Sequence, residues 1–134
     1  MLFPNPEAAA RQYRKIATQS TVDDASPHRL IQLMMQRALE KIGLAKSHIR
    51  ERKVQEKGNN ISDAISIING LQASLNHSAD ARLSENFDAL YAYMMRRLLE
   101  ANLHNNTGML DEVAGLLREI KEAWDAIADE VEGA

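Results

Sequence analysis

Four histidines, His28, His48, His77 and His104, are the residues of this sequence best suited to hold a metal ion or a phosphoryl group. They fall in unrelated segments, and none belongs to a Glu-x-x-His pair, the spacing with which helical bundles hold paired iron or manganese ions. Glu100 and His104 stand one helical turn apart, but no second pair accompanies them. We therefore expect neither a metal site nor a cofactor.

Other catalytic patterns are missing as well. Cys is absent from the 134 residues, and the sequence contains no glycine-rich phosphate loop and no nucleophile elbow. Glu119 and Glu122 belong to an acidic helix face, where carboxylates mainly provide solubility. A histidine phosphotransfer domain would need an exposed mid-helix histidine followed by Lys-Gly, which no histidine here has. We predict a protein that is not an enzyme, with a phosphotransfer or other signalling bundle as the alternative.

The charge pattern argues against two classes of partner. The formal net charge is −3, and the basic residues between Lys46 and Lys57 are interrupted by Glu51 and Glu56, with no aromatic residue among them. Nucleic-acid binding is therefore not expected. No segment approaches the roughly 18 apolar residues of a membrane span, so stable membrane insertion is not expected either. The first residues lack the pattern of a secretory signal, which predicts a cytoplasmic protein.

Helices must position whatever the protein binds. Ser26-Pro27 is a strong helix start, because serine caps free N–H groups and proline suits the first helical position. Breaks between helices are expected at Lys57–Asn60, near Ser78, which would be an N-cap, and at Asn105–Gly108. The helix that follows the first break could begin several residues before Lys57. The apolar spacing between these breaks predicts an all-α fold: an antiparallel up-down four-helix bundle over residues 25–134 with a short acidic C-terminal tail. Residues 1–24 would form an N-terminal arm that covers the binding groove and could hold a short helix.

Two of the expected helices are apolar over more of their circumference than one core contact needs. The last helix keeps its apolar residues within about 120°, whereas the arc is about 180° on the helix that contains Tyr91 and about 240° on the helix after Pro27. This surplus predicts a groove for a partner's amphipathic helix, covered at rest by Tyr13 and Ile16 of the arm. A homodimer formed through the same faces stays open. The candidate lining residues are Ile31, Met34, Met35, Tyr91, Met95 and Leu99.

Several stretches resemble the flagellin export chaperone family, FliS. They are residues 25–31, 56–58, 64–68, 86–94, 96–103 and 110–113, in order and with the family's spacing between about Tyr13 and Trp124. The resemblance implies a helical bundle that binds the disordered C-terminal segment of flagellin, prevents its premature polymerisation, and delivers it to components of the flagellar type III export gate. It also implies that Tyr13 packs over the groove and gives way to the client.

Overall fold

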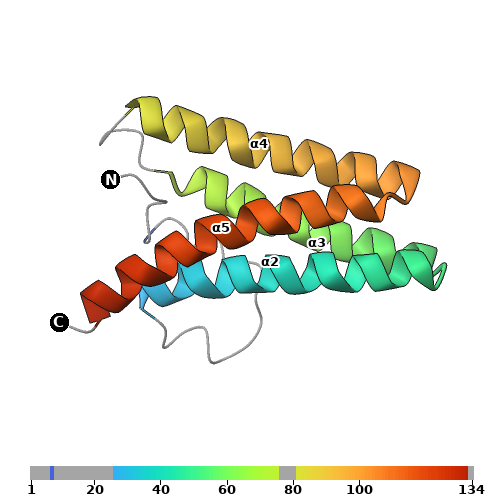
Figure 1. Cartoon of the computed structure of the whole chain (residues 1–134), viewed down its shortest axis with the longest axis horizontal. Coiled ribbons are helices and arrows are strands. Elements are labelled where there is room, and N and C mark those ends of the chain that lie inside the picture. Colours follow the sequence, from blue (N-terminus) through green and yellow to red (C-terminus); the bar gives the residue numbers. More distant parts are fainter. Residues whose placement is uncertain (1–6, 8–25, 76–80, 133–134) are drawn as a thin grey trace.

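The computed structural model of this chain describes Glu7, residues 26–75 and residues 81–132, with side chains described in Glu7, 26–75 and 85–127. Within these ranges the chain forms α2 (Pro27–Arg50), α3 (Val54–Ala73), α4 (Ala81–His104) and α5 (Thr107–Glu132). Each helix packs against the next, and α5 returns to pack against α2. Successive helices run in opposite directions (Figure 1). The predicted all-α, antiparallel up-down bundle is confirmed.

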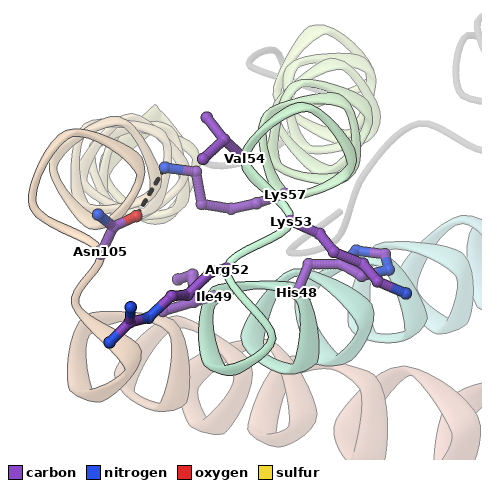
Figure 2. A pocket seen from close by; sticks show the side chains of 7 residues that line it. All are labelled: His48, Ile49, Arg52, Lys53, Val54, Lys57 and Asn105. Carbon is purple, nitrogen blue, oxygen red and sulfur yellow. Dashed lines mark hydrogen bonds between the residues drawn. The ribbon is translucent and has the colours of Figure 1, made fainter.

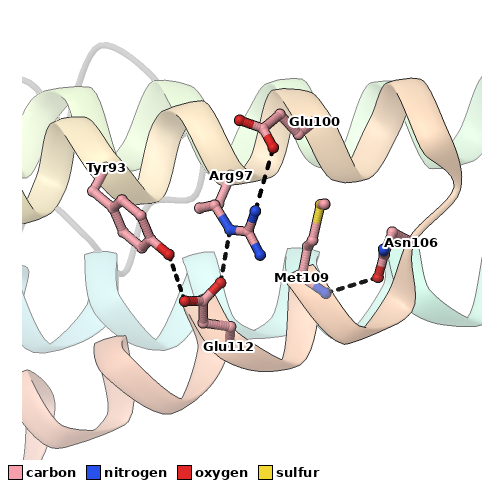
Figure 3. A network of polar contacts seen from close by, with 6 residues as sticks. All are labelled: Tyr93, Arg97, Glu100, Asn106, Met109 and Glu112. Carbon is pink, nitrogen blue, oxygen red and sulfur yellow. Dashed lines mark hydrogen bonds and ion pairs between the residues drawn. The ribbon is translucent and has the colours of Figure 1, made fainter.

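The predicted helix starts at Ser26 and near Asn106 are also confirmed. The Ser26 backbone is extended and its hydroxyl oxygen accepts a hydrogen bond from the Arg29 N–H at 3.1 Å, with Pro27 following as the first helical residue. At the start of α5, the Asn106 side-chain oxygen accepts from the Met109 N–H at 3.1 Å (Figure 3). Both side chains satisfy N–H groups that have no acceptor inside the helix. The expected cap at Ser78 lies outside the described residues.

The turn between α2 and α3 lies earlier than the expected break at Lys57–Asn60. The chain reverses at residues 51–53, and Gly58 lies inside α3, as the earlier of the two expected helix starts allowed. Arg52 adopts a left-handed φ of 58°, and the Lys53 N–H donates to the His48 carbonyl at 2.9 Å, which closes the end of α2. A glycine weakens an isolated helix by only about 1 kcal/mol, and packing of α3 in the bundle overrides that preference.

The core fills the space between the four helices with aliphatic side chains and methionines. Trp124 of α5 is fully buried, its indole N–H donates to the His28 carbonyl at 3.0 Å, and its ring stacks on the His28 ring with 4.6 Å between centroids. This contact ties the second half of α5 to the first turn of α2. Among the described helices, none is both long enough and apolar enough to cross a membrane. The fully buried aliphatic and methionine side chains include Ile31, Met34, Met35, Ile68, Leu71, Met94, Leu98, Leu110, Val113 and Leu117.

The predicted division at residue 25 stays a prediction. Apart from Glu7, residues 1–24 lie outside the described part of the chain, and so do Tyr13 and Ile16.

Candidate binding surface

One edge of α4 exposes a line of apolar side chains. Met95 is half-buried, Leu99 is 58% exposed and Leu103 is 76% exposed. Steps of four residues place side chains one above the other along a helix, so these three form a continuous strip. We call Met95, Leu99 and Leu103 the α4 strip. Leu99 and Leu103 keep most of their surface outside the core, so the strip can bury apolar surface of another molecule.

The opposite edge of α4 is fixed by polar contacts to α5 (Figure 3). The Tyr93 hydroxyl donates to the Glu112 carboxylate at 2.5 Å, and the Arg97 Nε–H donates to the other oxygen of that carboxylate at 2.7 Å. Arg97 also pairs with Glu100 at 3.3 Å. The Tyr93 hydrogen bond first, and then that of Arg97, lower the pKa of Glu112 below its ordinary value. These contacts join α4 to α5 near the surface, whereas the buried Tyr91, Met94 and Leu98 keep another face of α4 in the core, and the strip consequently faces outward.

The start of α3 lies beside the end of α4. The Lys57 ammonium donates to the Asn102 carbonyl at 3.0 Å and to the Asn105 side-chain oxygen at 2.7 Å. Val54, one turn before Lys57, is 72% exposed. Three of the four large apolar side chains that are exposed in the described residues, Val54, Leu99 and Leu103, therefore belong to the α3–α4 pair; the fourth is Leu44 of α2.

The structure distributes the predicted lining residues between core and surface. Ile31, Met34, Met35 and Tyr91 are fully buried, Met95 is half-buried, and Leu99 is exposed. Sequence reasoning missed Leu103 and Val54. Leu103 could have been found by continuing the four-residue step beyond Leu99, whereas Val54 precedes the expected start of its helix.

Tyr91 is the most polar of the buried candidates. Its ring centroid lies 6.5 Å from that of Phe87, and its hydroxyl is buried with no hydrogen-bond partner among the described residues. Burial raises the pKa of the Tyr91 phenol well above its ordinary value. An unpaired hydroxyl in an apolar environment costs free energy, because it has given up its hydrogen bonds to water.

Two of the described histidines, His28 and His48, contact neighbouring helices or residues of the bundle. His28 stacks on Trp124, and the His48 Nδ1 lies 2.9 Å from the Asn60 side-chain nitrogen. Across the described part of the chain, no three His, Cys, Asp or Glu side chains gather closely enough to hold a metal ion. What this surface offers is apolar contact rather than chemistry at a reactive group.

Comparisons with known proteins agree with the resemblance seen in the sequence. The family model described as flagellar protein FliS matches residues 9–131. The chain is 45% identical over 120 residues to the flagellar secretion chaperone FliSB of Pseudomonas aeruginosa, covering 90% of this chain and 95% of the relative. It is 40% identical over 119 residues to the flagellar secretion chaperone FliS of Salmonella typhimurium, covering 88% of each. A Bacillus subtilis relative of the same name is 37% identical over 124 residues, covering 92% and 86%. FliS proteins are chaperones and not enzymes, and this chain belongs to the FliS family of flagellar secretion chaperones.

Proposed function

We propose that this protein is a cytoplasmic chaperone that binds the disordered C-terminal segment of flagellin, prevents its premature polymerisation and delivers it to the flagellar type III export apparatus. Membership of the FliS family supports the role in flagellar secretion. The exposure of Leu99 and Leu103 on α4 is the observation that carries the binding part of the proposal.

The α4 strip suits a client that folds as it binds. Ordering a disordered segment costs about 2–5 kcal/mol or more, which apolar contact must offset. Burying one leucine side chain contributes about 1.5–3 kcal/mol. Leu99 and Leu103, together with their counterparts on the client, therefore provide enough apolar surface to offset the ordering of one short helix.

The buried candidates need a second step. Ile31, Met34, Met35 and Tyr91 have no exposed surface, so we propose that they contact flagellin only after Tyr13 and Ile16 have moved away. This part rests on the family resemblance. The exposed strip and the buried candidates would then bind successive parts of the client.

The test replaces strip residues with aspartate and follows the client. Leu99→Asp and Leu103→Asp should abolish capture of a flagellin C-terminal peptide and release the block on flagellin polymerisation, with unchanged helical content by circular dichroism. Leu44→Asp is the matched control, because Leu44 is 46% exposed but belongs to α2. Peptide capture by Leu99→Asp at the wild-type level, or an equal loss in Leu44→Asp, would remove the α4 strip from the account.

A second copy of the chain is the competing occupant of the strip. Sedimentation of the free protein at increasing concentration distinguishes the two. A dimer that Leu103→Asp dissociates would assign the strip to self-association, whereas a monomer at all concentrations leaves it to the client.

A further inference from the structure

A pocket of about 400 Å³ lies at the end of the bundle where the α2–α3 turn meets the α4–α5 turn (Figure 2). Among the described residues, the ionisable side chains that line it are basic or histidine, and none is Asp or Glu. The two apolar members, Ile49 and Val54, form part of the wall. The described residues that line the pocket are His48, Ile49, Arg52, Lys53, Val54, Lys57 and Asn105.

Lys57 is a buried cation in this pocket. Lys57 is only 7% exposed, and its ammonium donates to two neutral oxygens, the Asn102 carbonyl and the Asn105 side-chain oxygen. No carboxylate pairs with it among the described residues. These neutral acceptors satisfy two of the three N–H groups of the ammonium and leave its positive charge uncompensated. A buried charge is costly unless an opposite charge approaches it.

Arg52 occupies a backbone position that favours another residue type. Its φ of 58° lies in the left-handed region, where glycine or asparagine is less strained. Its guanidinium extends toward the turn that carries Asn105 (Figure 2) and forms no ion pair in the described part of the chain. Lys53, in contrast, pairs with Glu51 at 3.0 Å. Arg52 and Lys57 therefore present two positive charges to the pocket without an acidic partner.

The protein's own acidic C-terminal segment is not positioned to supply that partner. α5 begins beside this turn and runs away from it over 26 residues, which is about 39 Å of helix. Within the described part of the chain no acidic side chain lines the pocket, and a carboxylate of another molecule would supply the missing negative charge. The net charge of −3 disfavours a long polyanion such as nucleic acid.

We propose that this pocket binds a glutamate-containing acidic segment of a partner protein. One carboxylate enters between Arg52 and Lys57, and the aliphatic part of the segment packs on Ile49 and Val54. The pocket shares Val54 with the exposed apolar residues of the α3–α4 pair but contains no residue of the α4 strip, and its test uses peptides unrelated to flagellin.

The test is a nitrogen-15 NMR titration of the full chain with the blocked pentapeptide Leu-Glu-Glu-Leu-Glu and its counterpart with Gln in place of Glu. The acidic peptide should shift the amide signals of the two turns saturably, and the Gln peptide should not. Arg52→Gly should weaken binding about tenfold, as expected for loss of one charge-assisted contact. Its melting temperature should stay equal or rise, because glycine fits the left-handed backbone.

Arg50→Ala is the matched control. Arg50 carries the same charge as Arg52, stands two residues before it in the sequence and does not line the pocket. Binding by Arg50→Ala should therefore stay within about twofold of wild type. Lys57→Met, which keeps the buried aliphatic chain, should weaken binding as Arg52→Gly does. The proposal would be overturned if no saturable shift appeared at about 10 mM acidic peptide, where a millimolar site is mostly occupied. Equal shifts with both peptides, or equal weakening of binding by Arg50→Ala and Arg52→Gly, would also overturn it. So would a pocket that binds inorganic phosphate but not the acidic peptide.

Discussion

Tyr91 and Leu99 lie two turns apart on α4, and Tyr91 is fully buried while Leu99 is 58% exposed. Eight residues rotate a helix by about 80° beyond two full turns, which is enough to carry a side chain from the core to the surface. Burial of Met94, Leu98 and Ala101 in the core holds α4 at this rotation. The same helix therefore contributes to the core with one face and offers the α4 strip with another.

Truncation to alanine should destabilise the protein strongly at Leu98 and hardly at Leu99. Leu98 is fully buried, and Leu98→Ala should cost about 2–5 kcal/mol of unfolding free energy because it leaves a cavity. Leu99→Ala should change stability by no more than about 0.5 kcal/mol. Urea unfolding followed by the fluorescence of Trp124, the only tryptophan, measures both. A large loss of stability in Leu99→Ala would place Leu99 in the core.

Tyr91→Phe should stabilise the protein or leave its stability unchanged, because the substitution removes a buried hydroxyl that has no hydrogen-bond partner among the described residues. The effect should grow in alkali. Above about pH 10 the phenol ionises in the unfolded chain but not in the fold, where its pKa is raised, so the wild type loses stability as pH rises. Tyr91→Phe lacks this loss. Urea unfolding of both proteins at neutral and alkaline pH measures the difference, and a destabilised Tyr91→Phe at neutral pH would show that the hydroxyl is hydrogen-bonded.

Glu112 should titrate below its ordinary range, since Tyr93 and Arg97 both donate to its carboxylate. The stabilisation from this carboxylate is present above its unfolded-state pKa and is lost as pH falls through the lower, folded-state pKa. Tyr93→Phe should raise the pKa of Glu112, because the Tyr93 hydrogen bond is the largest cause of the shift. Carbon-13 NMR of the carboxyl group measures it. An unchanged pKa in Tyr93→Phe would contradict the assigned cause.

Trp124→Ala should be among the most destabilising single changes, at about 3–5 kcal/mol. It removes a fully buried ring, the hydrogen bond to the His28 carbonyl and the stacking on the His28 ring. Thermal unfolding followed by circular dichroism measures the loss. A variant as stable as wild type would mean that the start of α2 and α5 are held together by other contacts.

The helical architecture could be predicted because its local signals are strong. Ser26-Pro27 and Asn106 cap their helices through contacts between residues close in sequence. The α2–α3 turn was harder to place. Residues 51–53 contain neither glycine nor proline, and the left-handed residue there is an arginine. Gly58 is the reason a break was predicted at Lys57–Asn60, but it lies inside α3, and packing with α2 and α4 stabilises that helix.

The candidate surface could be predicted only in part. Arc width identified surplus apolar residues on α2 and α4, but it measures a helix in isolation. Whether Met35 or Leu99 is buried depends on how each helix is rotated against its neighbours. Core contacts between helices set that rotation, and these contacts join residues far apart in sequence. Lys57 shows the same limit. Its burial follows from the approach of the α4–α5 turn, which its own neighbours do not indicate.

The central claim is that this chain binds the C-terminal segment of flagellin through apolar contact, and calorimetric titration of the wild-type protein with that peptide tests it most directly. The expected result is saturable binding with a negative heat-capacity change between two temperatures, the mark of apolar burial coupled to folding. No heat at either temperature, together with no change in the mobility of the peptide on addition of the protein, would contradict the claim.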